Sequence, residues 1–109
     1  MKAHKQAILG AREHETRLTR AFSGRPARGI VNRFMAAVGD DVLPFPLQNA
    51  LTRPLRTAAA RQGRAELLSL WTGQGLRLAR RQSAASLVAR LAAEAEAAVR
   101  RLDASSASP

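Results

Sequence analysis

The chain has 109 residues, of which 46% are apolar and 24% are charged, so it is long enough for one small domain and too apolar to be disordered throughout. It carries 18 Lys and Arg against 8 Asp and Glu, a net charge of +10, and it has no Cys, which excludes disulfides and thiolate metal sites. A complete eight-stranded α/β barrel typically needs about 250 residues, so the chain is too short to close one.

The first predicted element is a helix over residues 3–13. Its apolar residues fall on one side at helical spacing: Ala3, Ala7, Ile8 and Ala11. No capping residue precedes Ala3, so we expect the natural beginning of this helix to lie upstream of Met1.

A short strand and a turn are predicted next. Loose alternation of apolar and polar residues, with two Thr, favours an extended backbone over residues 16–22. The sequence Ser-Gly-Arg-Pro at 23–26 predicts a turn, because Gly24 permits unusual backbone angles and Pro26 biases Arg25 away from helix. Pro26 could also serve as the first residue of a helix.

Two further helices are predicted in the middle of the chain. Apolar residues at i, i+3, i+4, i+7 spacing predict an amphipathic helix over residues 27–38, ended by Gly39. Residues 40–46 contain two Pro and break regular structure. A helix then resumes over residues 47–61, with Pro54 starting or kinking it and Gly63 ending it. Its predicted buried face comprises Leu47, Ala50, Leu51, Leu55, Ala58 and Ala59.

The last third of the chain contains a glycine-rich turn between helical segments. Residues 71–75 read Trp-Thr-Gly-Gln-Gly, and two Gly within three residues mark a turn or a close backbone approach. Residues 76–81 are compatible with a helix. Ser83 is a plausible N-cap for a final amphipathic helix that runs to about Leu102, and the Ser/Ala-rich tail 103–109 is predicted to be disordered.

No catalytic constellation is visible in the sequence. The two His residues, His4 and His14, have no second imidazole or carboxylate cluster at metal-ligand spacing, and the local Glu13-His14-Glu15 is more typical of a solvated helix end. No acid/base pair stands out, and Ser23 lacks the flanking glycines and partners of a nucleophile elbow. The residues themselves therefore predict no catalytic and no metal site.

Three side chains leave alternatives open. Trp71 is flanked by leucines and is more typical of a core anchor than of a flavin or substrate contact. Arg25 and Arg28 have the guanidinium geometry that grips a phosphate or a carboxylate, or they cap carbonyls and face water, the reading that we favour slightly.

The strongly basic charge raises the alternative of a small helical module that binds RNA or the ribosome. However, 16 of the 18 cations are Arg and they are spread along the chain, without a solid basic run or an aromatic platform. A solvated basic face is the simpler interpretation, and nucleic acid is disfavoured as a partner. The sequence also has no apolar run of 18 residues and no signal-peptide pattern, so we expect a cytoplasmic protein without a membrane partner.

Several stretches, taken in order, resemble the closing third of the nitronate monooxygenases, formerly called 2-nitropropane dioxygenases. They are residues 3–5 (AHK), residues 15–34 (ETRLTRAFSGRPARGIVNRF), residues 45–49 (FPLQN) and residues 70–75 (LWTGQG). The most specific of them is the run TRLTRAFSGRPARG at 16–29. Flavin-dependent enoyl reductases and quinone reductases of the same barrel superfamily are the nearest alternatives.

The resemblance implies a parent flavoprotein with an FMN-binding (β/α)8 barrel and a small second domain, which oxidises alkyl nitronates with O2 to carbonyl compounds and nitrite. This chain would be its C-terminal fragment, mainly α with a short strand near 16–22. The implied divisions are residues 1–14, a helix continuing from the barrel; residues 15–65, the small substrate-side domain; residues 66–102, helices that return to pack on the barrel; and the tail 103–109.

The resemblance also implies which residues approach the cofactor. The segment 71–75 would lie near the flavin and the substrate cavity, with Thr72, Gly73 and Gln74 lining it. The family's catalytic His and the loops that hold the FMN phosphate belong to the part upstream, which has no counterpart here. We therefore expect the fragment alone to be inactive, and either a truncated enzyme or a gene remnant fits this pattern. Helix faces that should pack on a barrel predict self-association.

Overall fold

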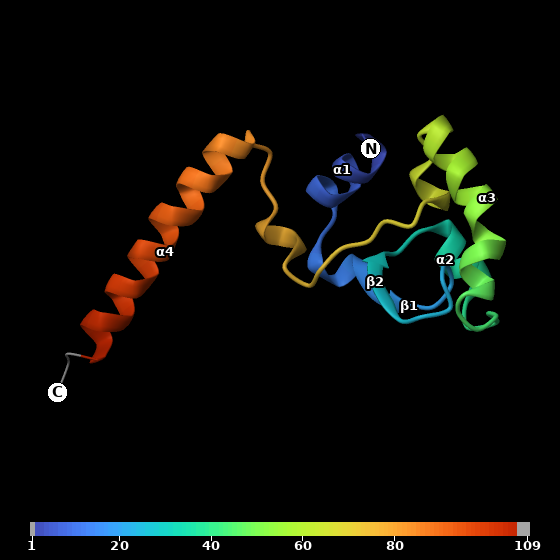
Figure 1. Cartoon of the computed structure of the whole chain (residues 1–109), viewed down its shortest axis with the longest axis horizontal. Helices are drawn as coiled ribbons and strands as arrows, with labels where there is room; N and C mark the ends of the chain where they lie inside the picture. Colours follow the sequence, from blue (N-terminus) through green and yellow to red (C-terminus); the bar gives the residue numbers. More distant parts are fainter. Residues whose placement is uncertain (1, 107–109) are drawn as a thin grey trace. The chain divides into compact units, whose positions relative to one another are not determined.

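The structure, a computed structural model, describes residues 2–106 and separates into two compact units, residues 1–79 and residues 80–109. Figure 1 traces the elements in chain order. The first unit contains α1 (Lys2–Gly10), η1 (Glu13–Glu15), β1 (Thr16–Thr19), β2 (Ala27–Ile30), α2 (Arg33–Val38), α3 (Leu47–Gln62), η2 (Ala65–Leu67) and η3 (Leu76–Leu78). The second unit contains α4 (Ala84–Ser106). The predicted mainly helical composition is confirmed, with one small sheet of two strands.

The two strands form an antiparallel hairpin, with Thr16 opposite Ile30 and Thr19 opposite Ala27. The predicted strand over residues 16–22 is confirmed in its first four residues. The predicted helix over residues 27–38 is wrong in its first half, because residues 27–30 form β2 and only residues 33–38 are helical. Over so few residues the same apolar spacing fits a strand and a helix, and pairing with β1 decides between them.

The turn that joins the strands is packed rather than solvated. Phe22 in this turn is fully buried, and Gly24 adopts a positive φ of 92°. A Cβ at Gly24 would lie 2.5 Å from the backbone N of Phe45, so no other residue fits there. The predicted turn is confirmed, but Pro26 leads into a strand instead of starting a helix.

Helix α2 begins at a side-chain cap. Asn32 has an extended backbone, and its Oδ1 accepts the N–H of Met35 at 3.1 Å. Its Nδ2 donates to the carbonyl oxygens of Ala65, at 3.1 Å, and Leu68, at 2.7 Å. One side chain thus starts a helix and ties the hairpin region to the segment that follows α3.

Helix α3 has the predicted bounds to within one residue, but its predicted buried face is largely wrong. The buried positions are Gln48, Thr52 and Ala59, whereas Leu47, Leu51 and Leu55 are exposed by 58%, 65% and 40%. Gln48 and Thr52 are buried because they donate hydrogen bonds to the turn that joins the two strands. Gln48 Nε2 donates to the carbonyl of Ala21 at 2.7 Å, and Thr52 Oγ1 donates to that of Phe22 at 2.6 Å.

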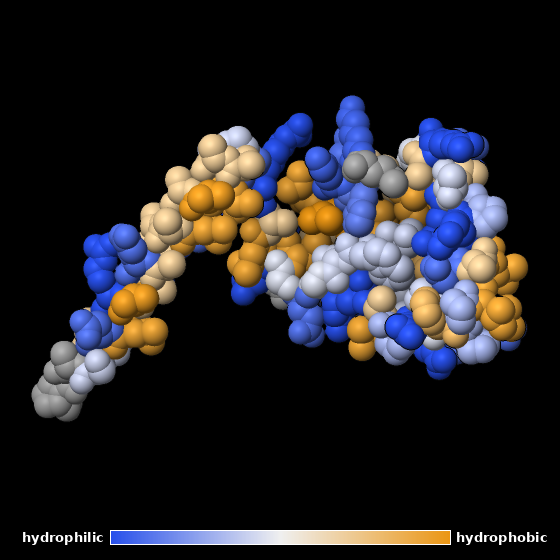
Figure 2. All heavy atoms as spheres, viewed as in Figure 1, coloured by the Kyte–Doolittle hydropathy of each residue, from blue (hydrophilic) through white to orange (hydrophobic). Residues whose placement is uncertain are grey.

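Of the two roles predicted for Pro54, starting the helix is wrong, because Pro54 lies inside α3, and a kink stays a prediction. The helix ends at Gly63 as predicted, with Gly63 in the left-handed region at φ 67° and its N–H returning to the last turn. Figure 2 shows apolar surface on the outer side of this helix.

The first unit has two small apolar clusters. One gathers Ile30, Ala59, Leu68, Leu70 and Leu76, and the other gathers Ala21, Phe22, Phe34 and Met35. The predicted apolar side of the first helix is confirmed, since Ala3, Ala7, Ile8 and Ala11 pack against the first cluster. Helix α1 itself ends at Gly10, and a 3-10 turn follows.

The second unit is a single long helix. Ser83 caps α4 as predicted, accepting the N–H of Ser86 at 3.1 Å on its Oγ. The helix continues through Ser106, so the prediction of a disordered tail is wrong for residues 103–106, while residues 107–109 lie outside the described part.

The predicted helix over residues 76–81, which begins in the first unit, is reduced to the single 3-10 turn η3. Among the helices of residues 2–106, none is long and apolar enough to cross a membrane.

Candidate functional site

The segment singled out by the sequence, residues 71–75, is anchored to the edge of β2; we refer to it as the tryptophan loop. Ile30 donates its N–H to the carbonyl of Leu70, and Thr72 donates its N–H to the carbonyl of Arg28, both at 3.0 Å. Gly29 and Trp71 form a bridge between these two bonds. The beginning of the loop therefore pairs with β2 and extends the hairpin by one short extended segment.

Gly29 makes this close approach possible. A Cβ at this position would lie 3.3 Å from the carbonyl oxygen of Leu70 and 3.6 Å from the indole ring of Trp71. The first contact is tighter than most Cβ atoms make, so the backbone of Leu70 would have to move by a few tenths of an ångström to admit a side chain, whereas the second is an ordinary contact. The glycine thus serves backbone packing against the loop.

The ring of Trp71 is a core anchor, the role that the sequence favoured. It meets Phe22 edge-on with ring centroids 5.3 Å apart, and Phe22 stacks on Phe34 at 4.7 Å. Edge-to-face and offset-stacked pairs at these distances are favourable beyond the apolar area that they bury.

The backbone of Trp71 is held a second time from α1. His4 Nε2 lies 2.9 Å from the Trp71 carbonyl oxygen, joining residues 67 positions apart. This contact could not be predicted, because nothing in the local pattern around His4 indicates a partner so distant in the chain.

The far side of the loop is anchored by a buried leucine. Leu76 is 4% exposed and begins η3, where Leu78 donates its N–H to the carbonyl of Gly75 at 2.9 Å. Between the two anchors Thr72 is half-buried, while Gly73 and Gln74 are exposed. The three predicted site residues thus form the middle of one loop, whose two ends are fixed and in which Gly73 and Gln74 face solvent.

The loop offers groups of the kind that contact a planar heterocycle such as a flavin. Gln74 has an exposed amide that both donates and accepts hydrogen bonds, and Thr72 has a hydroxyl. Apart from Gly73 and its two chain neighbours, no residue has a heavy atom within 4 Å of a Cβ built on Gly73, so a ring could approach its backbone closely. These residues fit a contact to the ring of FMN.

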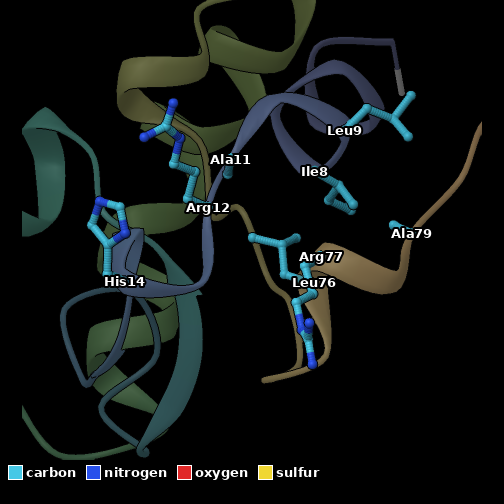
Figure 3. Close-up of a pocket in the computed structure, with 8 residues that line it drawn as sticks. All are labelled: Ile8, Leu9, Ala11, Arg12, His14, Leu76, Arg77 and Ala79. Atoms are coloured by element: carbon cyan, nitrogen blue, oxygen red, sulfur yellow. The ribbon is translucent and has the colours of Figure 1, made fainter.

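A separate pocket of about 490 Å³ opens between α1 and η3 (Figure 3). Ile8 and Leu9 come from α1, and Leu76 and Arg77 come from η3. Its remaining lining residues are Ala11, Arg12, His14 and Ala79. The lining combines apolar and basic side chains and includes no carboxylate, so it presents no acid/base pair.

The run at residues 16–29 has structural roles. Arg28 donates from Nη1 to Thr16 Oγ1 at 3.0 Å across the hairpin, and Arg20 donates from Nε to the Gly24 carbonyl at 3.1 Å. Arg25 lies over the ring of Phe45, 4.0 Å from its centroid. These contacts support the reading of Arg25 and Arg28 as structural residues rather than as a phosphate grip.

Electrostatic perturbations lie away from the tryptophan loop. Partial burial, with a smaller contribution from Arg53, lowers the pKa of Arg56, which donates to Thr52 Oγ1 and to Asn49. Backbone hydrogen bonding and the ion pair with Arg64 lower the pKa of Glu66. Within residues 2–106, no group of three His, Cys, Asp or Glu could hold a metal ion. The loop therefore supplies polar contacts and not acid/base chemistry.

Comparisons with known proteins point in one direction. The family model described as nitronate monooxygenase matches residues 1–94. A Bacillus subtilis (strain 168) protein named "Probable nitronate monooxygenase" is 48% identical over 77 residues, covering 68% of this chain and 22% of its own length. A Staphylococcus aureus (strain MSSA476) protein of the same name is 42% identical over 90 residues, covering 80% of this chain and 25% of its own length.

A solved structure agrees with the relatives. The nitroalkane oxidase from Streptomyces ansochromogenes superposes with a TM-score of 0.83 and 48% identity, over 92% of this chain and 29% of that one. The chain thus spans about a quarter of the length of the proteins that it resembles. These matches favour the flavoenzyme resemblance over the RNA-binding alternative, and the chain belongs to the nitronate monooxygenase family.

Proposed function

We propose that this chain is the C-terminal part of an FMN-dependent nitronate monooxygenase, an oxidoreductase that converts alkyl nitronates and O2 to carbonyl compounds and nitrite. The observation that carries the proposal is the match to the nitroalkane oxidase, with 48% identity over 92% of this chain and only 29% of the larger one. Identity at this level over nearly the whole chain supports common chemistry as well as a common fold.

In this proposal the chain contributes contacts to the cofactor and not the catalyst. Thr72, Gly73 and Gln74 line the flavin site, since they are the polar and unobstructed residues of the anchored loop. When bound, FMN supplies the acceptor for the electrons of the nitronate. The role of these three residues is to hold the isoalloxazine ring and keep it in one orientation.

The remaining surfaces fit a role as part of a larger fold. Residues 1–14 continue from a (β/α)8 barrel, residues 15–65 form the small domain, and residues 66–102 return to the barrel. Helix α4 supports this division, because none of its residues is buried and its apolar side includes Leu91 and Leu102, exposed by 57% and 71%. A helix with so much apolar surface requires a partner surface.

The same surfaces predict how the isolated chain behaves. Without a barrel to cover them, α4 and the exposed leucines of α3 favour self-association. The chain alone is proposed to be inactive, because it contains neither the phosphate-binding loops nor a candidate base. Light scattering over a concentration series should show a mass that rises with concentration.

The proposal is tested by completing the fold. The chain would be joined in frame to the part of the Bacillus subtilis relative that lies outside the match, and the joined protein would be purified and desalted. We expect about one flavin per joined chain and nitrite release from an alkyl nitronate in the presence of O2. The 109-residue chain, mixed with FMN and desalted, should retain no flavin and release no nitrite.

A matched pair of variants tests the loop. Gln74→Leu in the joined protein removes the exposed amide and should weaken flavin retention, whereas Gln62→Leu, at the end of α3, should not. A joined protein that retains flavin but releases no nitrite from nitronates would contradict the proposed reaction. Retention of FMN by the chain alone would contradict the placement of the main binding loops outside it.

A further inference from the structure

We propose that His4 is a positioning residue, which fixes the tryptophan loop, residues 71–75, in the orientation that presents Thr72, Gly73 and Gln74 to the flavin. The inference rests on the proposed function for the identity of the ligand. The hydrogen bond that carries it is present in the chain itself and can be tested without any cofactor.

The chemistry of the contact fixes its direction. His4 Nε2 lies 2.9 Å from the carbonyl oxygen of Trp71, and a carbonyl oxygen can only accept a hydrogen bond. The hydrogen is therefore on Nε2, which assigns the neutral ring to the Nε2–H tautomer. A protonated ring also carries this hydrogen, so the bond persists in either charge state.

The backbone geometry explains why a side chain is needed at this point. In an extended segment successive carbonyls point to opposite sides. The Leu70 carbonyl and the Thr72 N–H face β2, where they bond to Ile30 and Arg28. The carbonyl of Trp71 therefore faces away from β2, and His4 on α1 is the group that meets it.

The loop is consequently held from two sides at its last fixed residue. On one side are the backbone of β2 and the close approach at Gly29, and on the other is the His4 imidazole. Thr72 follows directly, and the exposed Gly73 and Gln74 come next. Removing His4 would leave the start of the loop held only on its β2 side, by the two backbone hydrogen bonds to Ile30 and Arg28, which changes where the amide of Gln74 points.

Two substitutions of similar size separate the hydrogen bond from bulk and helix propensity. His4→Leu removes the donor, and His4→Gln retains an N–H that can reach a carbonyl. Leu and Gln are both better helix formers than His, so neither should weaken α1. Any difference between them reports on the donor.

Amide hydrogen exchange of the 109-residue chain, measured by NMR, is the primary readout. In His4→Leu the Thr72 amide should exchange roughly five- to tenfold faster, the scale expected for one lost hydrogen bond. In His4→Gln its exchange should return to within about twofold of the parent value. The amides of Gly24 and Val31, bonded to Arg20 and Glu15, should exchange at unchanged rates in both variants.

Fluorescence gives an independent readout, because Trp71 is the single Trp of the chain. His4→Leu should shift its emission, and His4→Gln should restore the emission. His14→Leu is the matched control, since this second His is exposed and lies in the pocket between α1 and η3. Unchanged Thr72 exchange in His4→Leu, or failure of His4→Gln to restore it, would overturn the inference.

The link to the flavin is tested in the joined protein described above. There His4→Leu should accelerate FMN dissociation several-fold and shift the visible flavin absorbance, whereas His14→Leu should change neither. If Thr72 exchange accelerates but flavin binding and absorbance stay unchanged, the flavin-positioning role is wrong, while the nitronate reaction, measured by nitrite release, stands on its own result.

Discussion

The two units of the chain are stabilised in different ways. The first unit, residues 1–79, has apolar clusters that are closed by buried polar side chains, with Gln48 and Thr52 bonded to the turn that contains Phe22. The second unit contains α4, in which no residue is buried. Its ion pairs, Arg80 with Glu94 and Arg100 with Glu96, are exposed and contribute little.

This difference shows which kind of contact can hold a small unit in a defined shape. A unit whose carbonyls are satisfied by its own side chains can keep a defined shape with a small core. A long helix rich in Ala has enough intrinsic propensity to remain partly helical, but its position is set by what covers its apolar side. The first unit should therefore unfold cooperatively and α4 should melt independently of it.

The largest expected effect is the loss of the aromatic cluster. Phe22→Ala removes a fully buried ring that contacts both Phe34 and Trp71 and should cost about 3–5 kcal/mol. For so small a core this should unfold the first unit, measured by urea titration of Trp71 fluorescence, while the helical circular dichroism of α4 persists. Phe45→Ala is the matched control: Phe45 is 41% exposed and pairs with Arg25, so about 1 kcal/mol or less is expected. Parallel loss of all helical signal would show that the units are coupled.

A smaller effect is expected at Asn32, which both caps α2 and binds two carbonyls. Asn32→Ala should destabilise the first unit by about 2–3 kcal/mol, because it removes the cap and leaves the Ala65 and Leu68 carbonyls without this donor. Asn32→Ser restores a capping oxygen but is too short to reach those carbonyls, so it should recover about 1 kcal/mol. Equal urea midpoints for the two variants would show that the cap contributes nothing.

Most errors of the sequence predictions also fall in the first unit, and those at α3 and β2 share a cause, whereas the error in the second unit is the tail 103–106, which is helical. The leucines of α3 predicted one buried face, yet Gln48 and Thr52 are buried because the carbonyls of Ala21 and Phe22 need donors. These partners are 27 and 30 residues away, beyond any local periodicity. Likewise, residues 27–30 form a strand because they pair with β1. His4 also bonds to a residue 67 positions away, Trp71.

Predictions of helix ends and turns, which depend on neighbours in the sequence, are confirmed at three positions. Ser83 caps α4, Gly63 ends α3, and Gly24 occupies the turn that its φ requires. The candidate site residues Thr72, Gly73 and Gln74 came from family resemblance, and their cofactor contact is still a prediction. What the sequence could not indicate is how this loop is held, because both of its anchors, β2 and α1, are formed by distant residues.

A change at the N-cap of α4 tests whether this helix melts independently of the first unit. Ser83→Ala removes the oxygen that accepts the Ser86 N–H and should destabilise the helix by about 1 kcal/mol or less. Circular dichroism should show a loss of helical signal on warming at lower temperature, with no shift in the Trp71 fluorescence transition. Ser105→Ala, near the other end of the same helix, is the control and should alter neither signal measurably. A shifted Trp71 transition in Ser83→Ala would mean that α4 stabilises the first unit.

The smallest effect concerns Glu66, which pairs with Arg64 at 2.8 Å beside the end of α3. Hydrogen bonding to the backbone, then the pairing with Arg64, lowers its pKa in the folded chain. A carboxyl with a lowered folded pKa stabilises the fold above its unfolded pKa, roughly 4.3, and loses that contribution as the pH falls through the folded value. The thermal midpoint of Glu66→Gln should therefore lie slightly below that of the parent at pH 7 and converge with it in acid. Because both side chains are more than 40% exposed, salt should also reduce the difference, and a gap that survives in acid would assign the stabilisation to packing instead of charge.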